Sequence, residues 1–246
     1  MKKVIVLPAY NASKTLEKTI NSIPDRNDYE IILVDDCSKD NTLEIAKKLG
    51  IETYKTPKNL GYGGNQKLCY TRALEKNPDI VVMLHPDYQY EPRAVGIMCK
   101  LIEYGICDVV LGNRIRTRKE SLEGGMPFYK YISNRFLTVI ENVIAGQNLG
   151  EWHSGLRAYS SRVLKTINWE KNSDDFVFDT QFLFQCVNEG FKIGDIPVPV
   201  KYFEEASSIN FTRSLNYGFS TLYVGFLYIL NKIGVKNKLF ERKNKV

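Results

Sequence analysis

The sequence predicts an α/β protein with a Rossmann-like, mostly parallel central sheet flanked by helices. Two observations predict this class. Short runs of apolar residues, each about as long as one strand, recur along the first half of the chain, and stretches with apolar residues at helical spacing separate them. Strands that alternate with helices form βαβ units, and these build a parallel sheet with helices on its faces.

The expected elements follow one another along the chain. The apolar runs predict strands at residues 4–7, 31–34, 51–54, 80–84, 108–112 and 193–202. Helical spacing predicts helices at residues 15–23, 38–49, 66–75, 95–104, 131–145, 176–189 and 215–233. The stretches between them predict a glycine-rich loop at 59–65, a basic mobile loop at 114–125 and a short strand or turn within 150–159.

Composition and charge exclude several classes of protein. The chain has 246 residues, of which 43% are hydrophobic and 25% charged, and this ordinary composition excludes disordered, collagen-like and small disulfide-rich proteins. The net charge of +6 is weaker than that of most nucleic-acid binders, so we expect no nucleic-acid partner. Five cysteines without a C-x-x-C pair indicate free thiols, and the first apolar run is too short for a signal peptide. Both features favour a cytoplasmic protein.

No linker or repeat interrupts the chain, so we expect a single domain at residues 1–214, followed by an apolar helix and a basic tail at 215–246. The apolar stretch is shorter than the ~18 residues that a membrane-spanning helix needs. An apolar helix beside a basic tail is typical of an interfacial anchor on an anionic membrane. The alternative is a helix that packs on the core or on a second subunit, which would form a homo-oligomer.

Polar residues follow the predicted strands, at the sheet edge where open α/β sheets bind ligands. The clusters are Pro8, Tyr10 and Asn11, then Asp35 and Asp36, then His85 and Asp87, and we expect them to meet in one crevice. Asp36 can accept hydrogen bonds from a nucleoside, or it can form only a turn and a helix cap. The glycine loop lets the backbone approach a ligand closely, and the helix after it favours anions.

A metal site is predicted at the end of the fourth strand. Asp87 and Gln89 lie on one face of an extended segment, so their oxygens can hold Mg²⁺ or Mn²⁺ while a diphosphate supplies further ligands. His85 can join them, because Mn²⁺ tolerates imidazole, or it can only form hydrogen bonds at the strand end. Neither G-x-G-x-x-G after the first strand nor G-x-x-x-x-G-K-[ST] is present, which excludes Rossmann dehydrogenases and Walker-type enzymes.

Taken in order, these motifs resemble a known family. The segments Pro-Ala-Tyr-Asn at 8–11, Asp-Asp-Cys-Ser-Lys-Asp at 35–40, the glycine loop and His-Pro-Asp at 85–87 are similar to those of family 2 inverting glycosyltransferases, which have the GT-A fold. Within that family the chain most resembles the dolichyl-phosphate mannose/glucose synthase-like branch, to about Tyr228. The resemblance implies a UDP- or GDP-linked sugar donor and a divalent metal, Mg²⁺ or Mn²⁺.

The resemblance also implies roles for individual residues on the donor side. Those matching positions that hold the nucleotide sugar are Pro8, Tyr10, Asn11, Asp36, Asn65 and Asp87. The family's D-x-D metal motif falls on residues 85–87, so His85 stands where its first acid is expected. Asp87 matches the second acid, and Gln89 matches a metal-binding amide of some relatives.

Further matches concern the acceptor side. Arg114 matches a phosphate-contacting arginine, and Arg135 lies in an acceptor-side segment. Residues 151–159 resemble the family's D-x-x-S-G-F-R-A segment, which places Glu151 at its acid and His153 and Ser154 near the acceptor. The matches continue with Asp179 in an acceptor-lining helix and a serine-rich segment at 206–210. The Q-x-x-R-W motif of processive relatives is absent, which favours transfer of a single sugar.

The expected reaction is metal-dependent transfer to a lipid phosphate or a glycan, in cell-envelope glycan synthesis at the inner face of a membrane. Arg114 and the metal would neutralise the leaving diphosphate. A hydroxyl acceptor needs a general base, for which Asp179 and Glu151 are the candidates. A polyprenyl phosphate is already an anion, needs no strong base, and would be positioned by Arg135. The alternative, motivated by His85, is a catalytically impaired sugar-nucleotide-binding or scaffold protein.

Overall fold

The computed structural model describes residues 1–199 and 211–243. Within these residues, seven strands form one sheet in the order β3-β2-β1-β4-β6-β5-β7. The strands are β1 (Lys3–Ala9), β2 (Glu30–Asp35), β3 (Glu52–Lys55), β4 (Ile80–Met83), β5 (Val109–Asn113), β6 (Arg157–Ser160) and β7 (Ile193–Pro197). β6 runs antiparallel to β4 and β5, while the other neighbouring strands are parallel. The predicted mostly parallel sheet is confirmed.

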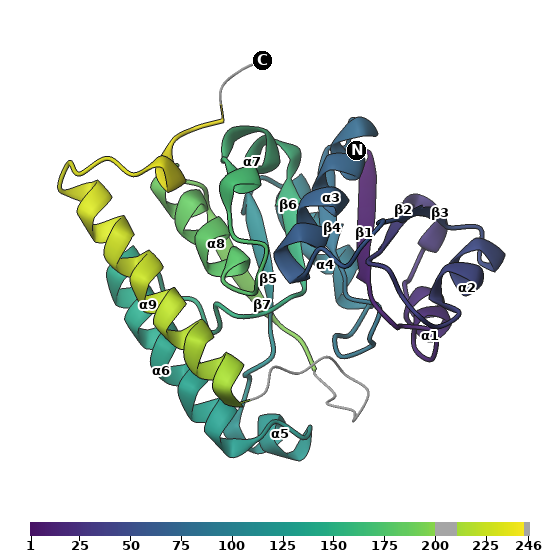
Figure 1. The fold of residues 1–246 in the computed structure, drawn as a ribbon, viewed down its shortest axis with the longest axis horizontal. Coiled ribbons are helices and arrows are strands. Elements are labelled where there is room, and N and C mark those ends of the chain that lie inside the picture. Colours follow the sequence, from purple (N-terminus) through teal and green to yellow (C-terminus); the bar gives the residue numbers. More distant parts are fainter. Residues whose placement is uncertain (200–210, 244–246) are drawn as a thin grey trace.

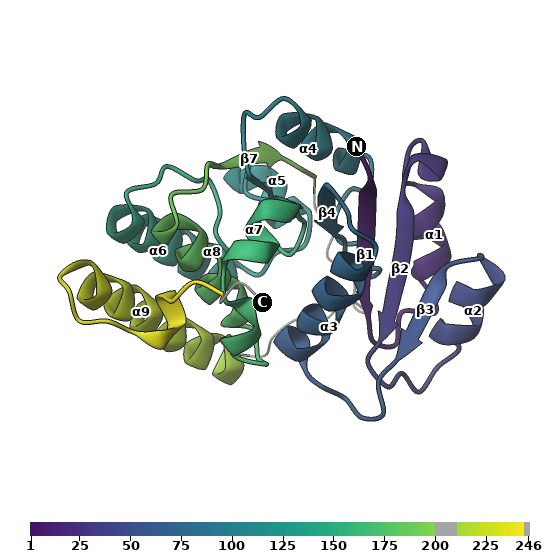
Figure 2. The ribbon, with the colours of Figure 1, turned by 90° about the horizontal axis from the view of Figure 1, so that it is seen from above.

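The helices of the described residues cover both faces of this sheet (Figures 1 and 2). They are α1 (Leu16–Asn21), α2 (Thr42–Lys48), α3 (Tyr62–Glu75), α4 (Ala94–Glu103), α5 (Arg118–Glu123), α6 (Phe128–Ala145), α7 (Ser161–Thr166), α8 (Phe178–Asn188) and α9 (Phe211–Lys232). α3 begins inside the predicted glycine loop, and α7 was not predicted. The predicted loop at 114–125 is wrong where α5 forms. There the Thr117 side chain accepts a hydrogen bond from the Glu120 N–H, and Thr-x-x-Glu is a capping pattern that could have predicted the helix.

Alternating strand residues fill two separate cores, as expected for strands buried on both faces. Val4 and Val6 of β1 pack on the side that carries α3, α7, α8 and α9. Ile5 and Leu7 pack on the opposite side, against α1, α2 and α4. This two-sided burial explains why the strands were visible in the sequence as continuous apolar runs.

The C-terminal helix α9 packs along α6 and α8, at the end of the molecule away from β3 (Figure 1). A Cβ on Gly225 of α9 would lie only 2.9 Å from Cδ1 of Ile144 on α6, so the glycine permits the two helices to approach closely. No helix in residues 1–199 and 211–243 combines the length and apolarity that a bilayer-spanning segment requires. The serine-rich segment at 206–210 lies outside the described residues.

Candidate active site

A cavity of about 770 Å³ lies beyond the carboxyl ends of β1, β2 and β4. Its walls contain all of the residues predicted to hold the nucleotide sugar, namely Pro8, Tyr10, Asn11, Asp36, Asn65 and Asp87. The predicted convergence of the strand ends on one crevice is therefore confirmed, except that Asp35 is buried and does not line the cavity. We call this the donor cavity.

The loops around the donor cavity are tied to one another. The side-chain oxygen of Asn11 accepts a hydrogen bond from the Lys39 N–H at 2.9 Å, and the N–H of Asn11 donates to Oγ of Ser38, also at 2.9 Å. The loop after β1 is thus fixed to the loop after β2. Tyr10 beside it is half exposed, which leaves its ring accessible to a flat ligand.

Asp36 organises the glycine loop. Its Oδ1 accepts hydrogen bonds from the Leu60 N–H at 2.7 Å and from Oγ1 of Thr56 at 3.1 Å, and its Oδ2 accepts from the Gly61 N–H at 3.2 Å. A carboxylate has about four acceptor positions, so Asp36 retains capacity for a nucleoside donor. The residue holds the loop in addition to lining the cavity.

The structure shows why glycine is needed at Gly63 in this loop, and the sequence did not indicate this reason. A Cβ on Gly63 would lie 2.4 Å from the carbonyl oxygen of Ser173, and the N–H of Gly63 donates to the carbonyl oxygen of Asp174 at 2.8 Å. The close backbone approach at Gly63 is therefore to the protein's own 173–174 segment and not to a ligand.

A second cavity, of about 190 Å³, adjoins the first and is lined by α6, α9 and the loop before β6. We call it the acceptor-side cavity. The two cavities share the walls formed by Tyr62, His85, Asp87 and Phe176. Rings dominate this boundary, because Tyr62 stacks on Phe176 with centroids 4.6 Å apart and on His85 with centroids 5.5 Å apart.

The predicted metal ligands Asp87, Gln89 and His85 all line the acceptor-side cavity, and Asp87 and His85 also line the donor cavity. The terminal amide nitrogen of Gln89 is buried and has no hydrogen-bond partner among the described residues. A side-chain amide can turn to present its oxygen, so an unpartnered amide beside a carboxylate fits a hard divalent cation. The described residues contain no cluster of three or more His, Cys, Asp or Glu side chains suited to a metal.

The ring of His85 packs closely against Gly155. A Cβ on Gly155 would lie 2.8 Å from both Cδ2 and Nε2 of the His85 ring, so only glycine leaves room for the imidazole here. Burial lowers the pKa of His85, and the nearby Asp87 only partly opposes this effect. The ring is therefore a neutral imidazole at neutral pH.

Glu151 does not have the environment of a general base. It is fully buried, its Oε1 accepts from Nε of Arg114 at 2.8 Å, and its Oε2 accepts from the Arg114 N–H at 2.8 Å. Nδ2 of Asn134 donates to Oε1 at 3.0 Å. Burial alone would raise the pKa of Glu151, but the charge and hydrogen bonds of Arg114 outweigh it and lower that pKa. The carboxylate positions Arg114, which lines the acceptor-side cavity.

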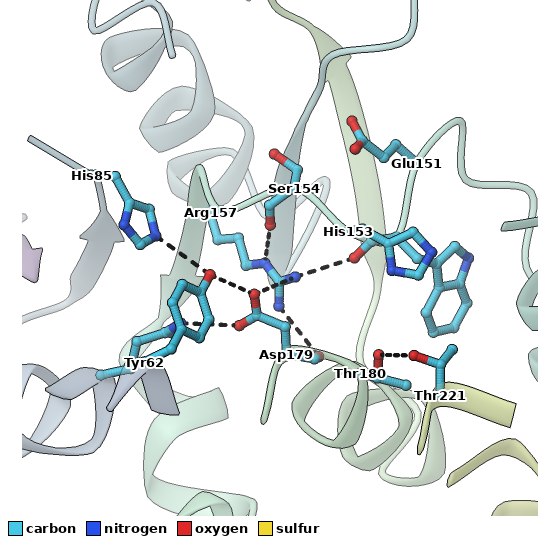
Figure 3. A network of polar contacts seen from close by, with 12 residues as sticks. Tyr62, His85, Glu151, His153, Ser154, Arg157, Asp179, Thr180 and Thr221 are labelled. Atoms are coloured by element: carbon cyan, nitrogen blue, oxygen red, sulfur yellow. Dashed lines mark hydrogen bonds and ion pairs between the residues drawn. The ribbon is translucent and has the colours of Figure 1, made fainter. Parts of the chain in front are cut away.

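Asp179 lines the acceptor-side cavity, but it too is paired (Figure 3). Its Oδ2 accepts from the Tyr62 hydroxyl at 2.8 Å and lies 3.3 Å from Nη2 of Arg157. Its Oδ1 accepts from Nε2 of Gln66 at 3.2 Å. Burial would lower the pKa of Arg157, but the charge of Asp179, together with smaller effects of nearby tyrosines, outweighs burial and raises that pKa. In this geometry Asp179 holds the hydroxyl of Tyr62 at the boundary of the two cavities, and its role as a base stays a prediction.

Two residues predicted to bind the acceptor lie away from the cavity. Arg135 donates to the carbonyl oxygen of Gly150 and does not line the cavity. Ser154 is fully buried and likewise does not line it. Arg135 lies on a different helical face from the lining residues of α6, and the Ser154 hydroxyl is enclosed by the protein. The structure does not bring these two residues to the cavity, and acceptor binding by them stays a prediction.

Lys130 of α6 is the cation that sequence reasoning missed. It lines the acceptor-side cavity and has no hydrogen bond or ion pair with any residue of 1–199 or 211–243. Burial, together with the charge of Arg114, lowers the pKa of Lys130. The face of α6 that lines the cavity carries residues at helical spacing, among them Lys130, Asn134 and Leu137. The sequence shows this spacing but does not show which face of the helix points into the cavity.

His153 lines the cavity but is held by the protein. Its Nδ1 lies 2.7 Å from the hydroxyl of Tyr217 on α9, and its Nε2 lies 3.0 Å from Oε2 of Glu141, outside good hydrogen-bond geometry. The neighbouring Trp152 is buried and donates from Nε1 to Oδ1 of Asn142 at 2.8 Å. Trp152 is therefore a packed core residue and does not stack on a sugar.

Comparison with known proteins now identifies the family. The sequence model of "Glycosyl transferase family 2" matches residues 4–167. The chain belongs to glycosyltransferase family 2. It is a nucleotide-sugar-dependent glycosyltransferase, and the predicted GT-A fold is confirmed. The chain is 29% identical over 217 residues to UDP-N-acetylglucosamine–dolichyl-phosphate N-acetylglucosaminyltransferase of Methanococcus voltae, covering 81% of this chain and 86% of the relative.

Two further proteins support this assignment. The dolichyl-phosphate hexose transferase of Haloferax volcanii is 26% identical over 199 residues, covering 80% of this chain and 82% of the relative. Among solved structures, glucosyl-3-phosphoglycerate synthase of Mycobacterium tuberculosis is similar with a TM-score of 0.66 and 19% identity, covering 96% of this chain and 81% of that one. At this identity the structural similarity supports the fold alone.

Proposed function

We propose that this glycosyltransferase transfers a single sugar, with inversion, from a UDP- or GDP-linked donor to a polyprenyl phosphate. The observation that carries the proposal is the charge pattern of the acceptor-side cavity. Its walls present Lys130, which has no ion pair with any described residue, and Arg114, which is held by the buried Glu151, while the carboxylate of Asp179 is already paired with Arg157 and Tyr62. Such a cavity suits an acceptor that arrives as an anion and needs no general base.

The donor side supports a nucleotide diphosphate sugar. The donor cavity combines an accessible aromatic ring at Tyr10 with the carboxylate of Asp36 and ends at Asp87. The Methanococcus voltae relative is named for a UDP-sugar donor and a dolichyl-phosphate acceptor. The Mycobacterium tuberculosis structure contains Mn²⁺ and UDP. These names favour the same substrate classes here.

Asp87 and Gln89 would hold Mg²⁺ or Mn²⁺, with His85 beside them. When bound, the cation neutralises charge on the departing diphosphate. Arg114, oriented by Glu151, and Lys130 hold the acceptor phosphate by charge-assisted hydrogen bonds.

The arrangement of the two cavities supports inversion. They meet at the ring boundary of Tyr62 and Phe176, so the sugar lies between the nucleotide on one side and the acceptor on the other. An acceptor oxygen that enters from the acceptor-side cavity reaches the anomeric carbon opposite the leaving diphosphate. One displacement of this kind inverts the anomeric configuration.

The proposed acceptor is a membrane lipid, so we also propose that the enzyme acts at the cytoplasmic face of a membrane, in glycan synthesis. Residues 1–214 would form the catalytic domain, and 215–246 its C-terminal helix and basic tail. The cysteines Cys37, Cys69, Cys99, Cys107 and Cys186 are all free thiols, which agrees with a reducing compartment.

The experiment compares two acceptors that differ only in the phosphate. Purified enzyme is incubated with UDP- and GDP-sugars and Mn²⁺, with either polyprenyl phosphate or the matching polyprenol. We expect a lipid-phosphate sugar carrying one sugar, identified by mass spectrometry, with inverted configuration by NMR. Equal transfer to polyprenol would contradict the proposal. Donor binding without transfer to any acceptor would instead favour a sugar-nucleotide-binding protein.

A further inference from the structure

Two helices of this protein expose continuous apolar stripes. On α6 the exposed stripe consists of Phe128, Ile132, Phe136, Val139 and Val143. On α9 it consists of Leu215, Phe219, Tyr223, Phe226 and Ile229, and Ile233 continues it just beyond the helix. The members recur every three or four residues, so each set lies along one side of its helix.

The two stripes form one surface, because the helices pack side by side (Figures 1 and 2). A Cβ on Gly218 would be 3.9 Å from Leu137, and one on Gly225 would be 2.9 Å from Ile144. Gly218 and Gly225 are seven residues apart on α9, and they face Leu137 and Ile144, which are seven residues apart on α6. The two helices therefore run in the same direction. Their buried residues face the core, and the stripes face away from it. We call this surface the α6–α9 face.

The charges around the α6–α9 face are unbalanced. The two helices contain only one acidic residue, Glu141, and it is buried. Basic residues border the face at both ends: Arg118 and Lys119 at one end, and Lys232, Lys236 and Lys238 at the other. Glu120 and Glu123 of α5 pair locally with Arg116 and Lys119, which offsets part of the charge at one end. The opposite end carries lysines beyond Ile233.

We propose that the α6–α9 face docks onto an anionic membrane surface, with its apolar side chains in the lipid and its basic residues at the headgroups. A row of large apolar side chains bordered by cations is the pattern of helices that lie in a bilayer interface. A second copy fits less well. In a two-fold dimer the same surface meets itself, so cations at both ends would face other cations in either orientation.

The position of the acceptor-side cavity supports the same occupant. Its walls include Tyr129, Lys130 and Ser133 from α6 and Ser214 and Tyr217 from α9. These residues lie in the first halves of the two helices whose outer sides form the docking face. A lipid phosphate in the bilayer interface therefore has a short path into the cavity, and its hydrocarbon chain can remain in the membrane.

The test uses the full chain and vesicles without polyprenyl phosphate, so its outcome does not depend on the transferase activity proposed above. Vesicles of phosphatidylcholine alone are compared with vesicles that also contain phosphatidylglycerol. The variant Phe136→Ser/Phe219→Ser removes one ring from each stripe, at side chains that are 60% and 71% exposed. The control Ile97→Ser/Tyr104→Ser alters side chains that are 60% and 73% exposed at α4, on the other side of the protein.

We expect the wild-type chain to bind the anionic vesicles, with weaker binding in high salt. The stripe variant should bind about tenfold or more weakly, while the control binds like the wild type and all three unfold at similar temperatures. Equal binding of the two variants would overturn the proposal. So would a wild-type dimer in sedimentation that the stripe variant converts to monomer without any binding to lipid, because the face would then belong to a second copy.

Discussion

The buried pair of Glu151 and Arg114 offers the most direct test of how the acceptor-side cavity is built. The substitution Glu151→Gln keeps the shape of the side chain and removes its charge. Four donor contacts converge on the wild-type carboxylate, three from Arg114 and one from Asn134. A glutamine has one acceptor oxygen and turns an NH₂ group toward Arg114, so the guanidinium would lose its buried carboxylate partner.

The expected loss of stability follows from that burial. Glu151 is fully buried and the Arg114 side chain is only 12% exposed, so little solvent screens the pair. Removing one partner of a buried pair costs about 3–5 kcal/mol, and the glutamine retains part of the hydrogen bonding, so we expect about 3 kcal/mol. In a protein of this size that corresponds to a fall of roughly 6–12 °C in the melting temperature.

Calorimetry and acceptor kinetics together check this reasoning. The control is Glu123→Gln, whose carboxylate is 65% exposed and lies 3.8 Å from Lys119. This change should alter the free energy of unfolding by no more than about 0.5 kcal/mol. A Glu151→Gln enzyme that melts like the wild type but has lost turnover would refute the positioning role and restore Glu151 as a base.

The dependence of this effect on pH has a definite sign. The folded-state pKa of Glu151 lies below the usual 4.5, because Arg114 outweighs the effect of burial. The pair therefore contributes fully above the unfolded-state value, and its contribution is lost as the pH falls through the folded-state pKa. The difference in stability between wild type and Glu151→Gln should shrink in acid.

Three further substitutions test the rest of the site. Asp87→Ala should lower turnover by roughly 100-fold in a Mn²⁺-supplemented assay, and chelation by EDTA should reduce the wild type similarly. Gly155→Ala should displace the His85 ring, since the new Cβ would lie 2.8 Å from it, and lower turnover on the order of 100-fold with the fold intact by circular dichroism. Lys130→Met should raise the KM for polyprenyl phosphate about tenfold to 100-fold and leave donor affinity measured by calorimetry unchanged. The control Lys48→Met alters an exposed lysine of α2 that lines neither cavity, and it should change neither quantity. A Lys130→Met enzyme with an unchanged acceptor KM would remove that residue from the acceptor site.

The donor cavity could be predicted from the sequence because its residues follow strand ends. A strand buried on both faces is visible as an apolar run, and the carboxyl ends of parallel strands share one edge. The positions of Tyr10, Asp36 and Asp87 follow from these two facts alone. The order of the sheet and the antiparallel β6 were not visible, because β6 has only four residues and no continuous apolar run.

The acceptor side could not be predicted in the same way, because many of its residues come from α6, α9 and the loop before β6. Arg135 and Lys130 are five residues apart on α6, and only packing against α9 decides which of them faces the cavity. Similarly, the sequence places an acid at position 151, but its burial against Arg114 depends on contacts between residues 37 positions apart. Long-range contacts of this kind have no periodic signature.

The two buried ion pairs beside the acceptor-side cavity support the proposal that the acceptor needs no general base. A buried pair contributes little net stability, since the desolvation of both ions offsets their attraction. What such a pair provides is a charge or a hydroxyl fixed in position. Glu151 fixes the guanidinium of Arg114, and the pair of Asp179 and Arg157 fixes the hydroxyl of Tyr62. When both acids are held in ion pairs, the site stabilises anions by preorganised dipoles and cations. A phosphate acceptor, which is already an anion, is a nucleophile that fits such a site.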